Sequence, residues 1–119
     1  MKRLRAIIVA VILLFSLVTE LRSEMLMEDY LKLKNTEEIQ FFLKGYLEGI
    51  LWANTWLASQ KRPELFCEPD RLVINIANLK QIVENHYERQ KVMYQQSLKK
   101  ENYFSLIAFY ALREAFPCK

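Results

Sequence analysis

Residues 37–60 of the chain read EEIQFFLKGYLEGILWANTWLASQ, and this stretch decides the fold class. Its apolar side chains return at intervals of three and four residues, which is the period of one face of an α-helix. Thr36 precedes the stretch as a predicted N-cap, and Glu37 and Glu38 follow where the helix dipole favours acidic side chains. We therefore predict a long helix over 37–60. Its buried face consists of Ile39, Phe42, Leu43, Tyr46, Ile50, Ala53 and Leu57.

The same predicted helix carries two further sets of residues that this buried face does not explain. Gly45, Gly49 and Ala53 stand four residues apart and form a shallow groove, and each glycine costs roughly 1 kcal/mol relative to alanine. We expect close approach by another backbone to be the reason, either inside the core or in a homodimer. Trp52 and Trp56 extend the apolar surface to another side of the helix. They are interpreted as core residues or as a partner surface, because tryptophan is enriched at binding hot spots.

The composition excludes several classes of protein. The 119-residue chain is 52% hydrophobic and has two glycines and three prolines. That apolar fraction is too high for a disordered chain, and so few turn-forming residues do not favour an all-β fold. One histidine and two cysteines make a structural zinc site unexpected, and neither glycine belongs to a phosphate-binding loop. We predict a single domain with no metal and no cofactor.

The first 23 residues have the pattern of a signal peptide. Three basic residues among the first five precede a thirteen-residue apolar run over 6–18, and this run is too short for a membrane-spanning helix. Cleavage after Ser23 would leave residues 24–119 as the exported domain. An uncleaved membrane anchor at the N-terminus is the alternative.

Export changes the interpretation of charge and of the cysteines. Loss of residues 1–23 removes four basic residues and one acidic residue, so the net charge of +3 belongs to the leader and the domain is neutral. The charge therefore gives no support for nucleic-acid binding. Cys67 and Cys118 would meet an oxidising compartment, and two cysteines without metal partners predict one disulfide. In the chain-entropy model, closing a loop of about 50 residues stabilises the domain by roughly 4 kcal/mol.

The segments on either side of the long helix also have helical patterns. A short amphipathic stretch covers residues 24–34, and Pro63 and Pro69 lie in a loop after the long helix, since neither can stand in a helix interior. The next helix is predicted to begin near Asn75 and to run to about residue 90.

The C-terminal part completes the predicted bundle. Residues 91–101 are polar, and we interpret them as either a helical extension or an exposed connection. The last helix is predicted over 103–116, with Asn102 as its N-cap. The sequence therefore predicts an all-α protein, a small disulfide-bonded bundle of about four helices.

His86 is the one imidazole in the chain. A catalytic histidine needs a nucleophile and an orienting acid near it in space, whereas Glu84, Asn85 and Glu88 point to other faces of the predicted helix. We interpret His86 as a structural residue, with a pH-sensitive contact and catalysis as the alternatives. No serine stands in the G-x-S-x-G motif of a nucleophile elbow. We therefore predict that the protein is not an enzyme and takes no small-molecule substrate.

Three motifs occur in a recognisable order. They are Gly45-Tyr46-Leu47-Glu48-Gly49, Cys67-Glu68-Pro69 and the C-terminal ALREAFPC of residues 111–118. In this combination the chain resembles the Rap/Tai family, the immunity proteins of type VI secretion amidase effectors. The resemblance covers about residues 39–118, and the C-terminal motif is its most specific part.

The resemblance implies a periplasmic all-α protein, often dimeric, that binds a cognate peptidoglycan amidase and blocks its active-site cleft. The catalytic cysteine and histidine would then belong to the amidase and not to this chain. Cys67 and Cys118 match the disulfide positions of the family. The alternative function is that of an envelope structural or chaperone-like protein with the same fold and no toxin partner.

The residues that would block the amidase do not form a fixed motif in the family. We therefore place the partner-binding site on chemistry alone, in the polar segment after the third predicted helix. Adaptable and aromatic side chains make good anchors in a cleft. The predicted partner-binding residues are Met93, Tyr94, Gln95 and Gln96.

Overall fold

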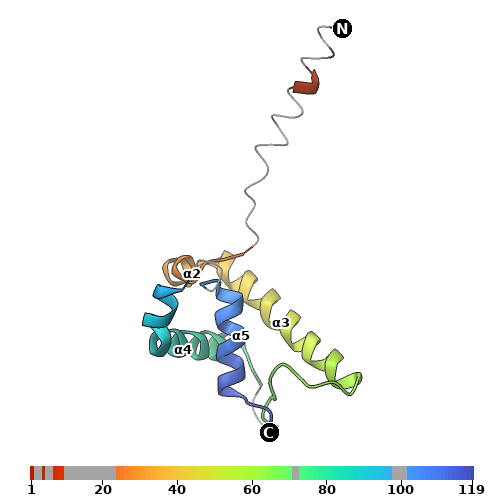
Figure 1. The fold of residues 1–119 in the computed structure, drawn as a ribbon, viewed down its shortest axis with the longest axis vertical. Helices are drawn as coiled ribbons and strands as arrows, with labels where there is room; N and C mark the ends of the chain where they lie inside the picture. The colour runs from red at the N-terminus through yellow and green to blue at the C-terminus, as the bar shows by residue number, and fades with distance from the viewer. Residues whose placement is uncertain (2–3, 5–6, 10–23, 71–72, 98–101) are drawn as a thin grey trace.

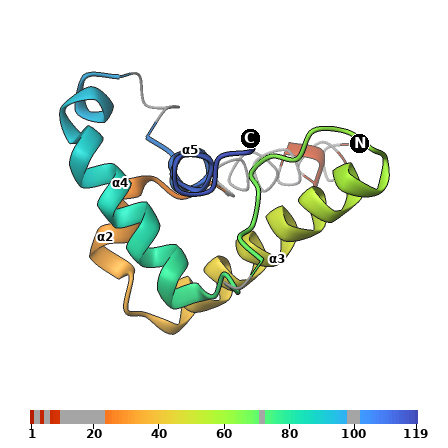
Figure 2. The same ribbon diagram turned by 90° about the horizontal axis from the view of Figure 1, so that it is seen from below.

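The computed structural model describes residues 1, 4, 7–9, 24–70, 73–97 and 102–119. From residue 24 onward, the described chain folds into α2 (Met27–Leu33), α3 (Glu37–Ser59), α4 (Ile76–Gln96) and α5 (Phe104–Ala115). Helix α5 stands in the middle, with α3 on one side and α2 and α4 on another (Figures 1 and 2). The predicted all-α bundle with one disulfide is confirmed.

Most of the predicted signal segment, residues 1–23, lies outside the described residues. The apolar side chains that are described in it, at Leu4, Ile7, Ile8 and Val9, are exposed and take no part in the core. Within the described ranges, the structure contains no helix with the length and apolar character needed to span a bilayer.

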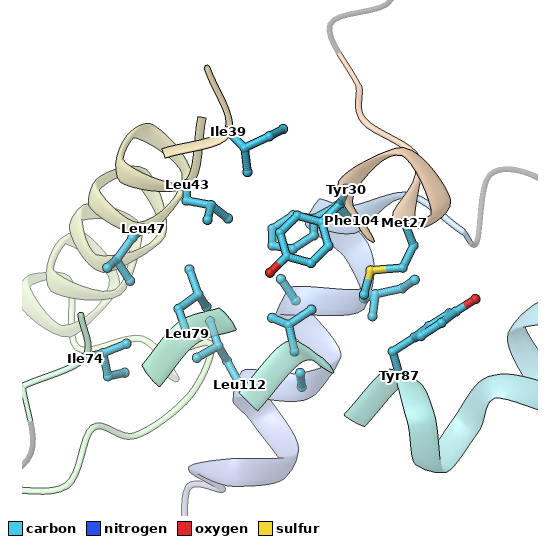
Figure 3. Close-up of a cluster of buried hydrophobic side chains, with 14 of the residues drawn as sticks. Met27, Tyr30, Ile39, Leu43, Leu47, Ile74, Leu79, Tyr87, Phe104 and Leu112 are labelled. Atoms are coloured by element: carbon cyan, nitrogen blue, oxygen red, sulfur yellow. The ribbon is translucent and has the colours of Figure 1, made fainter. Parts of the chain in front are cut away.

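Phe104, in the first turn of α5, is the centre of the core (Figure 3). Its ring centroid lies 4.5 Å from that of Tyr30 in α2, and 5.7 Å and 5.9 Å from those of Phe42 and Tyr46 in α3. Three helices therefore meet at one aromatic side chain. The rest of α5 continues this core toward α4, with Ile107, Ala108, Ala111 and Leu112 also buried.

The starts of α2 and α5 are joined through the backbone. The Met27 N–H donates to the carbonyl of Asn102, and the Phe104 N–H donates to the carbonyl of Met25, both at 2.8 Å. These bonds occupy N–H donors that the first turn of a helix leaves unpaired. The N-cap of α5 is Tyr103, one residue later than the predicted Asn102.

The boundaries of α3 and α4 largely follow the predictions. Thr36 is the N-cap of α3, but its hydroxyl donates to the carbonyl of Leu33 at 2.8 Å and so caps the end of α2 instead. Asn75 caps α4 through a reciprocal pair of hydrogen bonds with Asn78. Helix α4 continues to Gln96, beyond the predicted end near residue 90. The first part of the polar segment is therefore a helical extension.

Cys67 and Cys118 form a disulfide, which joins the loop after α3 to the C-terminus. The Cys67 N–H also donates to the carbonyl of Phe116 at 2.9 Å. Disulfides form and persist in oxidising compartments. The fold is therefore one that suits such a compartment.

Asn54 holds the same loop against α3. Its side chain donates to the carbonyl of Phe66 at 2.6 Å and accepts from the N–H of Leu65 at 2.7 Å. Asn54 is buried, which no pattern in the sequence predicts, and Phe66 is fully buried beside it.

The buried face of α3 is narrower than its pattern predicts. Ile39 and Leu43 are buried as expected, whereas Leu47 and Asn54 are buried without having been predicted. The reason is that α3 meets the bundle mainly through its first half, and its second half has only Asn54 buried. The other predicted core residues are partly buried: Phe42, Tyr46, Ile50, Ala53 and Leu57.

Candidate protein-binding surfaces

The outer face of α3 is an exposed stripe formed by Phe41, Gly45, Gly49, Trp52 and Trp56. The three aromatic residues are 68%, 72% and 57% exposed respectively. The interpretation of the tryptophan pair as core is therefore wrong for the chain on its own. Large aromatic side chains grouped on one exposed face are typical of a surface that a partner covers.

The two glycines are not explained by packing within the chain. A Cβ atom built at Gly45 or at Gly49 would meet no other atom within 4 Å. The expected close approach inside the core is therefore absent at both positions, and the homodimer stays a prediction. Ala53, the third residue of the predicted groove, is half-buried and lies closer to the body of the molecule.

A hollow of about 350 Å³ adjoins the outer face of α3 at Gly45. Phe41, Phe42 and Tyr46 line it from α3, and Met25 lines it from the segment before α2. Gly45 therefore borders a largely apolar depression.

The second exposed surface lies at the end of α4, where residues 93–96 form the last turn of the helix. Met93 is 52% exposed, and Gln95 and Gln96 are exposed as well. Tyr94 is 3% exposed and belongs to the core, so its side chain does not reach a partner. A helix turns by 100° per residue, and the four predicted residues therefore point in different directions.

The end of α4 and the facing side of α5 enclose a hollow of about 580 Å³, which we call the α4–α5 hollow. Met93 and Tyr110 stand at its rim, and Tyr110 is 45% exposed. Gln95 borders a different hollow of about 410 Å³, on the side of α4 that faces α2. The residues that line the α4–α5 hollow are His86, Gln90, Met93, Tyr94, Leu106 and Tyr110.

His86 is buried at the base of the α4–α5 hollow, between two partners. Its Nδ1 is hydrogen-bonded to the Glu114 carboxylate, and its Nε2 lies 2.9 Å from the hydroxyl of Tyr94. Arg89 donates to the other oxygen of Glu114 at 3.0 Å. The hydrogen bond from His86, together with Arg89, lowers the pKa of the Glu114 carboxyl from its ordinary value of 4.5.

A carboxylate, an imidazole and a hydroxyl in line form the arrangement that activates a nucleophile in acyl-transfer enzymes. Here the hydroxyl belongs to the buried Tyr94, and its bond with His86 lies within the core. The three groups link the last turns of α4 to α5. This geometry fits a structural role for His86, and the prediction that the protein is not an enzyme stays a prediction.

The described residues include one cluster of three side chains of the kinds that bind metal ions. Ligand atoms of Glu64, Cys67 and Cys118 lie within 4.8 Å of one another. Both sulfur atoms belong to the disulfide, and a disulfide offers no thiolate to a metal. The group is therefore suited to a metal only in a reduced chain.

Comparisons of the chain with protein-family models, with curated proteins and with solved structures find no match. The resemblance to the Rap/Tai family therefore stays a prediction that rests on the three motifs.

Three residues of these surfaces were not predicted from the sequence. Phe41 precedes Gly45 by four residues, so a helical projection of the Gly and Trp stripes would have included it. Tyr110 follows the helical spacing of the buried Ile107 and Ala111, yet it is 45% exposed. Glu114 comes from a helix that the sequence does not place beside His86, and no local pattern identifies it as a partner.

Proposed function

We propose that the protein is a periplasmic immunity protein of the Rap/Tai type. It binds a peptidoglycan amidase effector of a type VI secretion system and occupies the active-site cleft of that enzyme. The observation that carries the proposal is the end of α4, where the exposed Met93 stands beside the α4–α5 hollow. The three motifs, in the long helix, at the loop cysteine and at the C-terminus, support the proposal through their resemblance to the Rap/Tai family.

The shape of this surface suits a cleft. The C-terminal turns of α4 lie at the edge of the molecule, away from α3, in both views (Figures 1 and 2). Because an enzyme cleft is concave, a protein that blocks it must insert a projecting element. The exposed side chains of Met93 and Gln96 supply one, and the α4–α5 hollow can accept a side chain from the rim of the cleft.

The polar bonds beneath the surface hold it in shape. Glu114 and Tyr94 fix His86 from both sides, and Arg89 adds a bond from α4 to the same carboxylate. A surface that is ordered before binding loses less conformational entropy when the complex forms. Methionine adapts to an irregular cavity, and Tyr110 provides an aromatic anchor of the kind that carries binding energy.

Met93→Asp tests the proposed site. A carboxylate buried in an amidase cleft without a partner should weaken the complex by about 100-fold, which corresponds to a hot-spot loss of roughly 3 kcal/mol. The matched control is Val92→Asp, because Val92 is 68% exposed and lies on another side of α4. Calorimetric titration with a purified peptidoglycan amidase effector measures both affinities.

Growth rescue supplies the functional readout. Cells that direct the amidase to the periplasm should survive with the unaltered chain or with Val92→Asp, and should lyse with Met93→Asp. If the unaltered chain neither binds nor rescues, the immunity proposal is wrong and the envelope or chaperone-like function takes its place. Equal losses in the two variants would contradict the assignment of the site to the Met93 side of α4.

A further inference from the structure

We propose that the outer face of α3 is a membrane-contact surface, which lies on the bilayer that the apolar run of residues 6–18 is predicted to enter. In this arrangement α3 lies parallel to the membrane plane, and Phe41, Trp52 and Trp56 enter the headgroup region. The proposal does not depend on the amidase, because it uses a surface away from the end of α4.

The three aromatic side chains project from the same side of α3. A helix turns by 100° per residue, so Phe41, Trp52 and Trp56 fall within an arc of about 60°. Gly45 and Gly49 lie on the same face between Phe41 and the tryptophans, and neither has a side chain that could cover the rings. The rings are therefore accessible from outside along the length of the face, in agreement with their exposed fractions.

The kinds of side chain on this face favour a lipid surface. Tryptophan combines a large apolar ring system with a polar N–H group, and it is enriched where the apolar part of a bilayer meets water. A helix that lies in this interface buries an apolar face and keeps charged residues at its edges. On α3 the aromatic stripe has Lys44 and Glu48 beside it, and both are exposed.

The described chain begins beside the outer face of α3. Glu24 and Met25 line the same 350 Å³ hollow as Phe41 and Gly45. The six-residue step from Val18, at the end of the apolar run, to Glu24 spans at most about 20 Å. An apolar run inserted in a bilayer therefore holds the first turns of α3 close to the membrane surface. This proximity gives the membrane a high effective concentration at the face, which a freely diffusing partner lacks.

The place of α3 in the fold suits contact with a flat surface. The helix has 23 residues and is therefore roughly 34 Å long. It forms one outer side of the molecule in both views (Figures 1 and 2). A helix at the edge of a small domain can meet a plane along its whole length.

The charges near the face indicate what drives the contact. The charged residues between positions 37 and 62 are all exposed, and the two signs are balanced: Glu37, Glu38, Glu48, Lys44, Lys61 and Arg62. Attraction to anionic lipids is therefore small, and burial of the aromatic rings drives the contact. By itself the face should bind reversibly, with an association constant on the order of 10⁴ M⁻¹, as for a single lipid chain.

Intrinsic fluorescence tests the proposal directly, because Trp52 and Trp56 are the two tryptophans of the chain. We expect vesicles of phosphatidylcholine and phosphatidylglycerol to shift the emission of the full chain to shorter wavelength. Lipids with bromine on their acyl chains should quench it. Sedimentation of the vesicles counts the bound chains, including those held through residues 6–18. Bound chains whose tryptophan emission is unchanged would overturn the proposal, and so would a chain that does not bind.

Phe41→Glu and Val92→Glu form a matched pair for this measurement. Both residues are 68% exposed, so neither change disturbs the core, and both variants keep the leader and the two tryptophans. A carboxylate at position 41 should lower the fraction of bound chains with lipid-quenched tryptophan by about 10-fold. Val92 belongs to α4, and its change should leave that fraction as it is. Equal quenching in the two variants would contradict the assignment to α3.

Two further comparisons separate the membrane from other occupants of the face. The emission shift should require lipid and should not depend on the concentration of the chain. A shift that appears without lipid as the chain is concentrated would show that a second copy covers the face, and the proposal would be wrong. Phosphatidylcholine alone should give the same quenching per bound chain, and a requirement for the anionic lipid would contradict an apolar contact.

Discussion

Helices α3 and α5 are both rich in apolar residues, yet they hold opposite places in the molecule. Five of the 12 residues of α5 are buried, whereas only four of the 23 residues of α3 are. The apolar residues of α5 meet α2, α3 and α4, while Phe41, Trp52 and Trp56 of α3 face solvent. An apolar helix in a small bundle is therefore not necessarily a core helix.

The difference follows from position in the chain and from what covers each helix. Helix α5 lies between the other helices and packs against α2, α3 and α4, so several of its sides meet a neighbour. The second half of α3 holds the loop that follows it through Asn54, and its Ile50 and Leu51 are partly buried against the core. A helix that is apolar over most of its circumference and has neighbours on one side retains an exposed apolar face.

Phe104→Ala should produce the largest loss of stability, and it tests how much α5 contributes to the core. The change removes the ring at which α2, α3 and α5 meet, and such a cavity costs about 3–5 kcal/mol of unfolding free energy. The matched variant is Phe41→Ala, at a residue that is 68% exposed, and it should change the unfolding free energy of the monomer by less than about 0.5 kcal/mol. Urea unfolding measures both free energies. Similar losses would show that Phe41 of α3 contributes as much to the core as Phe104 of α5, which would contradict the comparison of the two helices.

Replacement of both Cys67 and Cys118 with serine should have the next largest effect. The disulfide closes a separation of 51 residues, and loss of that constraint on the unfolded chain costs up to about 4 kcal/mol. Urea unfolding of the double variant under oxidising conditions measures this cost. If the two proteins unfold at the same urea concentration, the disulfide does not stabilise the end of α5.

Asn54→Ala should destabilise the contact between α3 and its loop by about 2 kcal/mol. The change leaves the N–H of Leu65 and the carbonyl of Phe66 without their partner in a buried setting. Thr55→Ala is the control, because the hydroxyl of Thr55 is exposed and bonds only within its own helix. Thermal unfolding should detect a loss for the first variant and nearly none for the second, and equal losses would contradict the buried role of Asn54.

The smallest effect concerns the pH dependence of the Glu114 contact between α4 and α5. Because the pKa of Glu114 is lowered in the folded chain, the stabilisation is complete above the ordinary value of 4.5 and is lost as the pH falls below it. Glu114 is 45% exposed, so solvent screening limits the effect to less than about 1 kcal/mol. The difference in stability between the unaltered chain and Glu114→Gln should be present at pH 6 and should shrink as the pH falls below 4.5. A difference that stays constant as the pH falls would contradict this linkage.

Much of the fold could be predicted because its signals are local. The period of the apolar residues places α3, the Asn75 cap marks the start of α4, and the two cysteines indicate one disulfide. The end of α4 was predicted too early, because residues 91–96 lack an apolar face that would distinguish a helix from a connection.

The sites were less predictable, because they depend on which helices meet. The periodicity of α3 identifies an apolar helix but does not say which of its sides is covered, so it is compatible with Trp52 and Trp56 both as core residues and as a partner surface. Tyr94 lies in a polar segment and is nevertheless buried, since His86 and Tyr87 of the preceding turns pack against its ring. The bond between His86 and Glu114 spans 28 residues and follows only from the packing of α4 on α5.

The mass of a complex with a peptidoglycan amidase effector is the most direct test of the proposed binding site. If the end of α4 binds the enzyme, light scattering should give one complex that contains both proteins for the unaltered chain, and two separate species for Met93→Asp. A chain whose mass does not change when the amidase is added would contradict the proposed function.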